Sequence, residues 1–164
     1  MKSILLVLSL TLTTQASNMF KFTESKLSKF SHLNFTWWGF KVYKAEVWTP
    51  NAAPPNFKRE ILLHIEYQRD FEKQDLVDST LDEWKDLGLL NKNKYQNWLR
   101  QLKTIWPNVK KGDSITTYVN KNTTYFYQGN KLLGKVNDQE FGPTFVQIWL
   151  HKNSKTSKLL KKSE

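Results

Sequence analysis

Hydrophobic residues recur at helical spacing through the middle of the chain, from Asp75 to Trp106. Gly88 divides this stretch where a helix would end, because glycine enters the left-handed cap conformation at little cost. The second half begins at Lys94, and Pro107 follows its last apolar residue. The apolar positions of the two halves are Leu76, Val77, Leu81, Trp84 and Leu87, then Tyr95, Trp98, Leu99, Leu102, Ile105 and Trp106. The pattern predicts a helical hairpin whose tryptophan-rich faces need a broad apolar partner.

Before this hairpin, apolar and polar residues alternate in the way that is typical of strands. The segment from residue 33 to 48 is strand-like, and Gly39 is expected to interrupt its pairing with a bulge or a bend. Residues 49–56 contain three prolines and are predicted to form a loop. Residues 58–69 alternate cleanly, so one face of this strand should be buried and the other partly wet. Residues 18–30 show no pattern that assigns them.

Three short strands are predicted after the hairpin, at residues 114–120, 123–128 and 131–136, joined by tight turns. Asp138 can then cap a helix over residues 139–150. One more short helix is expected around Leu159 and Leu160, within an otherwise flexible, lysine-rich tail. A set of strands with a separate set of amphipathic helices predicts a two-layer α+β domain.

The first 16 residues have the pattern of a secretory signal peptide. Lys2 precedes an apolar run from Ile4 to Leu12, and Thr14 and Ala16 stand at the −3 and −1 places of a cut after Ala16. The predicted organisation is therefore a signal peptide over 1–16 and one domain over 17–164, in a periplasmic or secreted protein. The alternative is that this run forms a buried N-terminal strand or helix.

The chain is basic, with a formal net charge of +10, but only three of its 25 basic residues are arginine. Scattered lysines indicate a solvated surface, whereas specific phosphate or base recognition more often uses the arginine fork. A nucleic-acid partner is therefore not expected.

The absence of cysteine excludes disulfides and thiol nucleophiles. No second long apolar run follows the leader, so the mature chain should be soluble, without a transmembrane segment.

Side chains that could carry metal or acid–base chemistry are dispersed. The three histidines, at positions 32, 64 and 151, fall in a predicted loop, a strand and a helix end, and none has a second ligand at metal spacing. Asp78 and Asp82 are one helical turn apart, but on a polar face, which favours solvated carboxylates over a catalytic pair. No metal and no cofactor are expected.

Six segments follow one another at the spacing of a known family. They are Gly39–Trp48, Tyr67–Asp70, Trp84–Gly88, Trp106–Asp113, Phe126–Gly134 and Phe145–Leu150. In order and number these segments resemble the chalcone isomerase-like family, specifically its small exported bacterial branch. The resemblance implies an open-faced β-sandwich: a large curved antiparallel sheet covered on one face by helices. This agrees with the two-layer α+β interpretation.

The resemblance also bears on activity. The family's plant enzymes close a flavanone ring with an arginine before the first long strand and with a tyrosine and an asparagine at the start of a helix. Here residues 31–39 contain no basic side chain except His32, and an ungapped match places Glu72 and Ser79 at the other two positions. Electrostatic stabilisation of the developing charge is usually the largest catalytic term. The resemblance therefore favours a protein that has lost the isomerase chemistry.

We expect a non-catalytic domain whose cleft holds a small amphipathic molecule such as a fatty acid, which other members of the family bind. The alternative is an intramolecular lyase or isomerase acting on a phenolic or enone substrate, which needs a basic group and a hydroxyl in one cleft. A third hypothesis is that the basic surface docks on an unidentified envelope protein. The candidate cleft residues are Tyr43, Tyr67, Arg69, Trp37 and Trp98.

Overall fold

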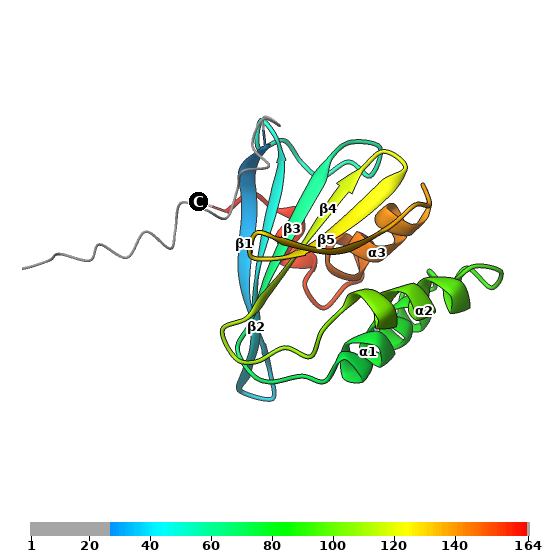
Figure 1. Cartoon of the computed structure of the whole chain (residues 1–164). Coiled ribbons are helices and arrows are strands. Elements are labelled where there is room, and N and C mark those ends of the chain that lie inside the picture. Colours follow the sequence, from blue (N-terminus) through cyan, green and yellow to red (C-terminus); the bar gives the residue numbers. More distant parts are fainter. Residues whose placement is uncertain (1–26, 164) are drawn as a thin grey trace, which may run out of the picture.

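The computed structural model describes residues 27–163, and it confirms the predicted α+β architecture. Six antiparallel strands form one sheet in sequence order, and three α-helices and a short 3-10 helix accompany it (Figure 1). The predicted signal peptide lies outside the described residues. The elements are β1 Leu27–Trp37, β2 Phe40–Pro50, β3 Ile61–Tyr67, α1 Lys73–Asp86, α2 Tyr95–Ile105, β4 Ser114–Asn120, β5 Thr123–Gln128, β6 Lys131–Val136, α3 Phe141–Leu150 and η1 Ser157–Leu160.

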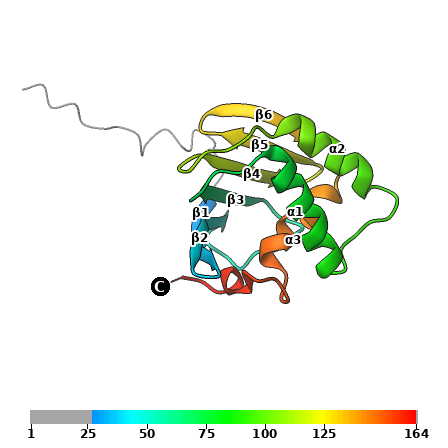
Figure 2. The same cartoon turned by 90° about the horizontal axis from the view of Figure 1, so that it is seen from below.

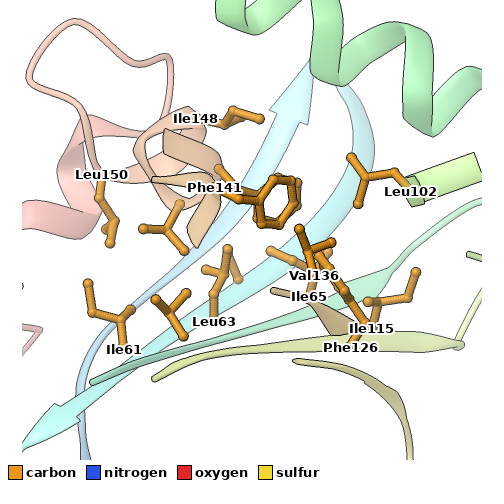
Figure 3. Packing of buried hydrophobic residues seen from close by; sticks show 14 of the residues in the cluster. Ile61, Leu63, Ile65, Leu102, Ile115, Phe126, Val136, Phe141, Ile148 and Leu150 are labelled. Carbon is orange, nitrogen blue, oxygen red and sulfur yellow. The ribbon is translucent and has the colours of Figure 1, made fainter. Parts of the chain in front are cut away.

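All three α-helices lie on one face of the curved sheet (Figure 2). The alternation along β3 explains this, because Ile61, Leu63 and Ile65 point toward the helices and are almost completely buried. Figure 3 shows these side chains beneath Phe141 of α3, with Leu102 of α2 beside it. The core thus lies between the sheet and the helical layer, as the amphipathic patterns predict.

The opposite face of β3 is less exposed to solvent than its polar residues suggest. Leu62 is 2% exposed and His64 is 7% exposed. Trp48 and Tyr118 are the cross-strand neighbours of Leu62, and His64 Nδ1 lies 2.8 Å from Thr116 Oγ1. Large side chains on adjacent strands therefore shelter the middle of this face.

The prediction of a bulge or a bend at Gly39 within one strand-like segment is wrong, because the chain reverses there completely. Trp37 pairs with Phe40, and β1 and β2 form a long antiparallel hairpin. The two residues between them, Trp38 and Gly39, have φ values of 50° and 78°. Positive φ at both central positions is the geometry of a type I′ turn, whose twist matches the twist of the strands. A tryptophan is rarely found at such a position, so the usual residue signal of a tight hairpin is missing here.

The two helices of the predicted hairpin meet through their aromatic residues. The ring centroids of Trp84 and Trp98 lie 5.7 Å apart, and Phe141 of α3 lies 5.6 Å from Trp98. Trp98 Nε1 donates to a carboxylate oxygen of Asp138, whose other oxygen accepts the backbone N–H of Glu140. Asp138 therefore joins α2 to the turn before α3, but it is not the predicted N-cap, because α3 begins at Phe141 with Glu140 at the N-cap position.

The C-terminal segment is packed and not flexible, contrary to the expectation for a lysine-rich tail. Leu159 in η1 is fully buried. Ser154 Oγ donates to the carbonyl of Ile148, and the backbone N–H of Ser163 donates to the carbonyl of Phe30 on β1. The segment 151–163, here called the C-terminal strap, therefore runs from α3 back to the edge strand β1 (Figure 2).

Candidate ligand-binding site

A cavity of about 200 Å³ lies between the sheet and the helices, toward the β1–β2 side. Strands β2, β3 and β4 form its floor, α1 and α3 form its walls, and the C-terminal strap closes it. Most of the surrounding groups are aliphatic or aromatic. Pockets that bind small molecules are typically lined in this way, with a few polar groups that orient the ligand.

Two tyrosines face each other on the floor of the cavity. Tyr43 on β2 and Tyr67 on β3 are directly paired across the sheet, and both line the cavity. The ring of Phe35 on β1 stacks on Tyr43 at a centroid distance of 4.9 Å. Because antiparallel partners project from the same face of a sheet, the pairing brings the two hydroxyl-bearing rings to one place.

Burial keeps both phenols neutral. Burial raises the pKa of Tyr67 well above its ordinary value of 10.0, and the neighbouring Tyr43 adds to this. Burial also raises the pKa of Tyr43; the charge of Glu83 raises it further, while Trp149 and Thr156 oppose the shift. A neutral phenol can donate a hydrogen bond but is a poor base. The two tyrosines therefore offer donors to a ligand and do not act as phenolates near neutral pH.

A third donor belongs to Trp149 at the end of α3. Its Nε1 is buried and makes no hydrogen bond of ordinary geometry within residues 27–163, although it lies close enough to the Tyr43 hydroxyl to lower the pKa of that phenol. Trp149 lines the cavity together with Thr156, whose hydroxyl donates to the backbone carbonyl of Trp149. Buried polar groups are normally hydrogen-bonded, so an indole N–H without a partner beside a cavity indicates room for an acceptor.

An ion pair lies at the edge of the cavity. Lys155 Nζ of the strap lies 2.5 Å from Glu83 Oε1 of α1, and both residues line the cavity. The two side chains are 45% and 23% exposed, so the pair lies between the cavity and solvent. Lys155 Nζ also lies 5.5 Å from the ring centroid of Trp37. A partly exposed ion pair of this kind contributes little net stability and can exchange partners.

The structure brings together only some of the residues that the sequence suggested for the cleft. Tyr43 and Tyr67 line the cavity, whereas Trp37, Arg69 and Trp98 do not. Arg69 lies over the ring of Phe71, with 5.3 Å between its Cζ and the ring centroid. Trp98 lies in the core beside Trp84, and Trp37 is 52% exposed near the tip of the hairpin.

Several polar residues of the cavity carry no signal in the sequence, among them Trp149, Lys155 and Glu83. Trp149 falls within the helix predicted over residues 139–150 and has no polar signal of its own, and Lys155 falls in the lysine-rich tail that is expected to be flexible. Glu83 looked like one of several solvated carboxylates on α1. The contact between Lys155 and Glu83 joins residues 72 positions apart, and no local pattern signals such a contact.

Within residues 27–163, no group of three or more histidine, cysteine, aspartate or glutamate side chains could hold a metal ion. The same residues include no helix that is both long and apolar enough to cross a membrane.

Comparison with known proteins agrees with this architecture. An uncharacterized protein of Haemophilus influenzae is 25% identical over 125 residues, which is 76% of this chain; the match spans only 61% of that relative's length. The crystal structure of an Arabidopsis thaliana fatty-acid binding protein superposes with a TM-score of 0.59 over 83% of this chain and 85% of that one. At 6% identity this likeness shows the fold alone. The family described as chalcone isomerase-like matches residues 36–163, and the chain belongs to that family.

Proposed function

We propose that this protein binds a small amphipathic carboxylate, such as a fatty acid, without transforming it. The observation that carries the proposal is the largely apolar cavity, at which the indole N–H of Trp149, the ammonium group of Lys155 and two neutral phenols can donate hydrogen bonds. The fatty-acid binding protein with the same fold supports this ligand class. The proposal makes the cavity a binding site and makes no use of a catalytic group.

The polar groups at the cavity favour an anionic head group. The indole N–H of Trp149 and the ammonium group of Lys155 can only donate, and the neutral phenols of Tyr43 and Tyr67 can donate. A carboxylate accepts several such bonds at once, and charge-assisted hydrogen bonds are about twice as strong as neutral ones. Glu83 opposes an anion, so we infer that a bound carboxylate replaces Glu83 as the partner of Lys155.

The size of the cavity limits the apolar part of the ligand. Pockets for drug-sized molecules measure roughly 300 to 1,000 Å³, and an engineered apolar cavity of about 150 Å³ accepts benzene. A cavity of about 200 Å³ therefore suits a medium-length acyl chain or a single aromatic ring better than a long acyl chain. A longer chain would have to extend out of the cavity past Lys155.

The arrangement supports an isomerase less well. That alternative required Arg69 to share a cleft with the tyrosines, and Arg69 does not line the cavity. Ser79 does line it, but Glu72, the other residue matched to the enzymes' catalytic groups, lies at the start of α1, where its N–H donates to Asp75. The cationic group that does reach the cavity, Lys155, is paired with Glu83.

Titration with octanoate, hexadecanoate and octanol tests the proposal, because Trp106 and Trp149 line the cavity and report on it by their fluorescence. We expect saturable binding of one molecule per chain, with octanoate binding more tightly than the uncharged octanol. Native mass spectrometry of the same samples gives the stoichiometry. If neither acid shows saturable binding, the proposed function is wrong.

Replacing Lys155 by methionine is expected to weaken octanoate binding by about tenfold. The variant loses one hydrogen bond to a charged group, worth about 1.5 kcal/mol when partial exposure is taken into account. Lys158→Met is the matched control, because Lys158 is on the same strap, is exposed and does not line the cavity. Glu83→Gln should instead strengthen binding. Equal affinities of the two lysine variants would exclude Lys155 as the anchor.

We also propose that the protein is exported, on the basis of the signal-peptide pattern in residues 1–16. Expressed in a Gram-negative bacterium, the chain should accumulate in the periplasmic fraction with the mass of residues 17–164. Intact mass spectrometry of the fractions measures this directly. An unprocessed chain confined to the cytosolic fraction would contradict export while leaving the ligand proposal untouched.

A further inference from the structure

Exposed aromatic residues gather at the tip of the β1–β2 hairpin. Trp37, Trp38 and Phe40 are 52%, 86% and 70% exposed. In the described part of the chain, the only other exposed large hydrophobic residue is Leu132, on the far edge strand β6. The hairpin projects from the bottom of the molecule in Figure 1. Single exposed hydrophobic residues are common on protein surfaces, but a contiguous group of aromatic ones marks an interaction site.

The backbone at the tip makes this grouping more informative. Trp38 has a φ of 50°, in the left-handed region where a bulky side chain is unfavourable, and asparagine or glycine usually takes this place in a type I′ turn. Trp38 therefore destabilises the folded protein, and it buries little surface that would offset this. Strain of this kind persists where function requires the side chain.

Basic residues surround the aromatic tip. Lys41 follows Phe40 directly, and Arg69 lies two residues beyond Tyr67, the end of β3 that pairs with Tyr43. In the described residues, neither Lys41 nor Arg69 forms an ion pair. Lys155 lies over the ring of Trp37, and it belongs to the ion pair at the edge of the cavity. Acidic groups also lie at this end, but Asp70 is paired with Lys110 and Glu83 with Lys155.

The tip is continuous with the candidate site. The Trp37 ring lies 6.4 Å from the Phe35 ring, which stacks on Tyr43 in the floor of the cavity. A chain of aromatic contacts therefore leads from the exposed hairpin to the cavity, with Lys155 beside it. A molecule that enters past Lys155 would pass the hairpin.

We propose that the tip of the β1–β2 hairpin inserts its aromatic side chains into the surface of an anionic membrane. Tryptophan is favoured at the boundary between head groups and acyl chains, because its ring is apolar and its N–H is polar. Basic residues beside it are attracted to anionic lipids, by about 1 kcal/mol for each lysine or arginine near the surface. The overall charge of +10 favours the same partner. The hairpin and the cavity edge would then face the lipid together.

The chain contains no cysteine, so a single introduced cysteine carries an environment-sensitive fluorophore at one known place. The probe is placed in the full-length chain by Phe40→Cys at the tip, or by Leu132→Cys as a control at an exposed position on β6. On vesicles of phosphatidylcholine with phosphatidylglycerol, the label at position 40 should shift to shorter wavelength and brighten several-fold. The label at position 132 should not change, even if residues 1–16 hold the chain to the vesicle.

Trp38→Gly, made in the Phe40→Cys background, separates insertion from folding. Glycine tolerates the positive φ, so the variant should melt at a higher temperature. Its binding to the anionic vesicles should nevertheless weaken by about tenfold, because the variant lacks the large side chain that Trp38 would bury in the membrane.

Three outcomes would overturn this proposal. The label at position 40 could remain in water on anionic vesicles, or it could respond equally to pure phosphatidylcholine, or the chain could form dimers that Trp38→Gly dissolves in the absence of lipid. None of these results depends on whether the cavity binds a carboxylate.

Discussion

Replacing Trp84 by alanine is expected to lower the free energy of unfolding by about 3 to 5 kcal/mol, as is usual when a fully buried large aromatic residue is truncated. Trp84 has no exposed surface. Its ring contacts those of Trp98 on α2 and Phe141 on α3, at centroid distances of 5.7 Å and 6.4 Å. The alanine variant therefore leaves a void where the three helices meet. Urea denaturation followed by circular dichroism measures the change.

The variant Trp84→Phe is the matched control, and its expected cost is below about 1.5 kcal/mol. The Nε1 of Trp84 is buried without a hydrogen-bond partner in the described residues, so phenylalanine gives up no hydrogen bond. It also retains most of the aromatic contacts. Equal destabilisation by both variants would mean that a phenylalanine ring does not replace the packing of the indole, which would contradict this prediction.

The helices that pack around Trp84, together with the last three strands, are the elements that the sequence predicts best. Helices α1 and α2 and strands β4 to β6 lie where the apolar periodicity places them, because each buries one face and has a clear turn or breaker at its ends. The hairpin at Trp38 and Gly39 was missed for a physical reason. Its turn has tryptophan where the usual signal is asparagine or aspartate, and its bordering residues are exposed aromatics that resemble a continuing strand.

The candidate site was predictable only where it depends on local alternation. Tyr43 and Tyr67 lie on the helix-facing side of their strands, so a strand pattern suffices to direct them toward the interior. Lys155 and Glu83 meet through tertiary packing of the strap against α1. The packing of Leu159 and the bonds of Ser163 to β1 hold that strap, and neither can be read from a lysine-rich segment.

Filling the cavity should abolish ligand binding and at the same time stabilise the protein. Thr117 lies on β4 in the floor of the cavity and is 2% exposed. The variant Thr117→Phe projects a ring into the space of about 200 Å³, where we expect it to weaken octanoate binding by at least about a hundredfold. Filling a cavity commonly stabilises a protein by about 0.5 to 2 kcal/mol, because the lining atoms gain contacts that they lacked.

The opposite signs of these two effects distinguish an occupied cavity from a misfolded protein. Ser114→Phe is the control, since Ser114 is on the same strand but projects from the opposite face of the sheet, so it should leave octanoate affinity unchanged. Fluorescence titration and urea denaturation of the same samples give both quantities. If Thr117→Phe is at least as stable as the parent chain and still binds octanoate with undiminished affinity, then the ligand lies elsewhere. If it is less stable, then the ring does not fit in this cavity, and a shorter side chain at position 117, in Thr117→Leu, becomes the decisive variant.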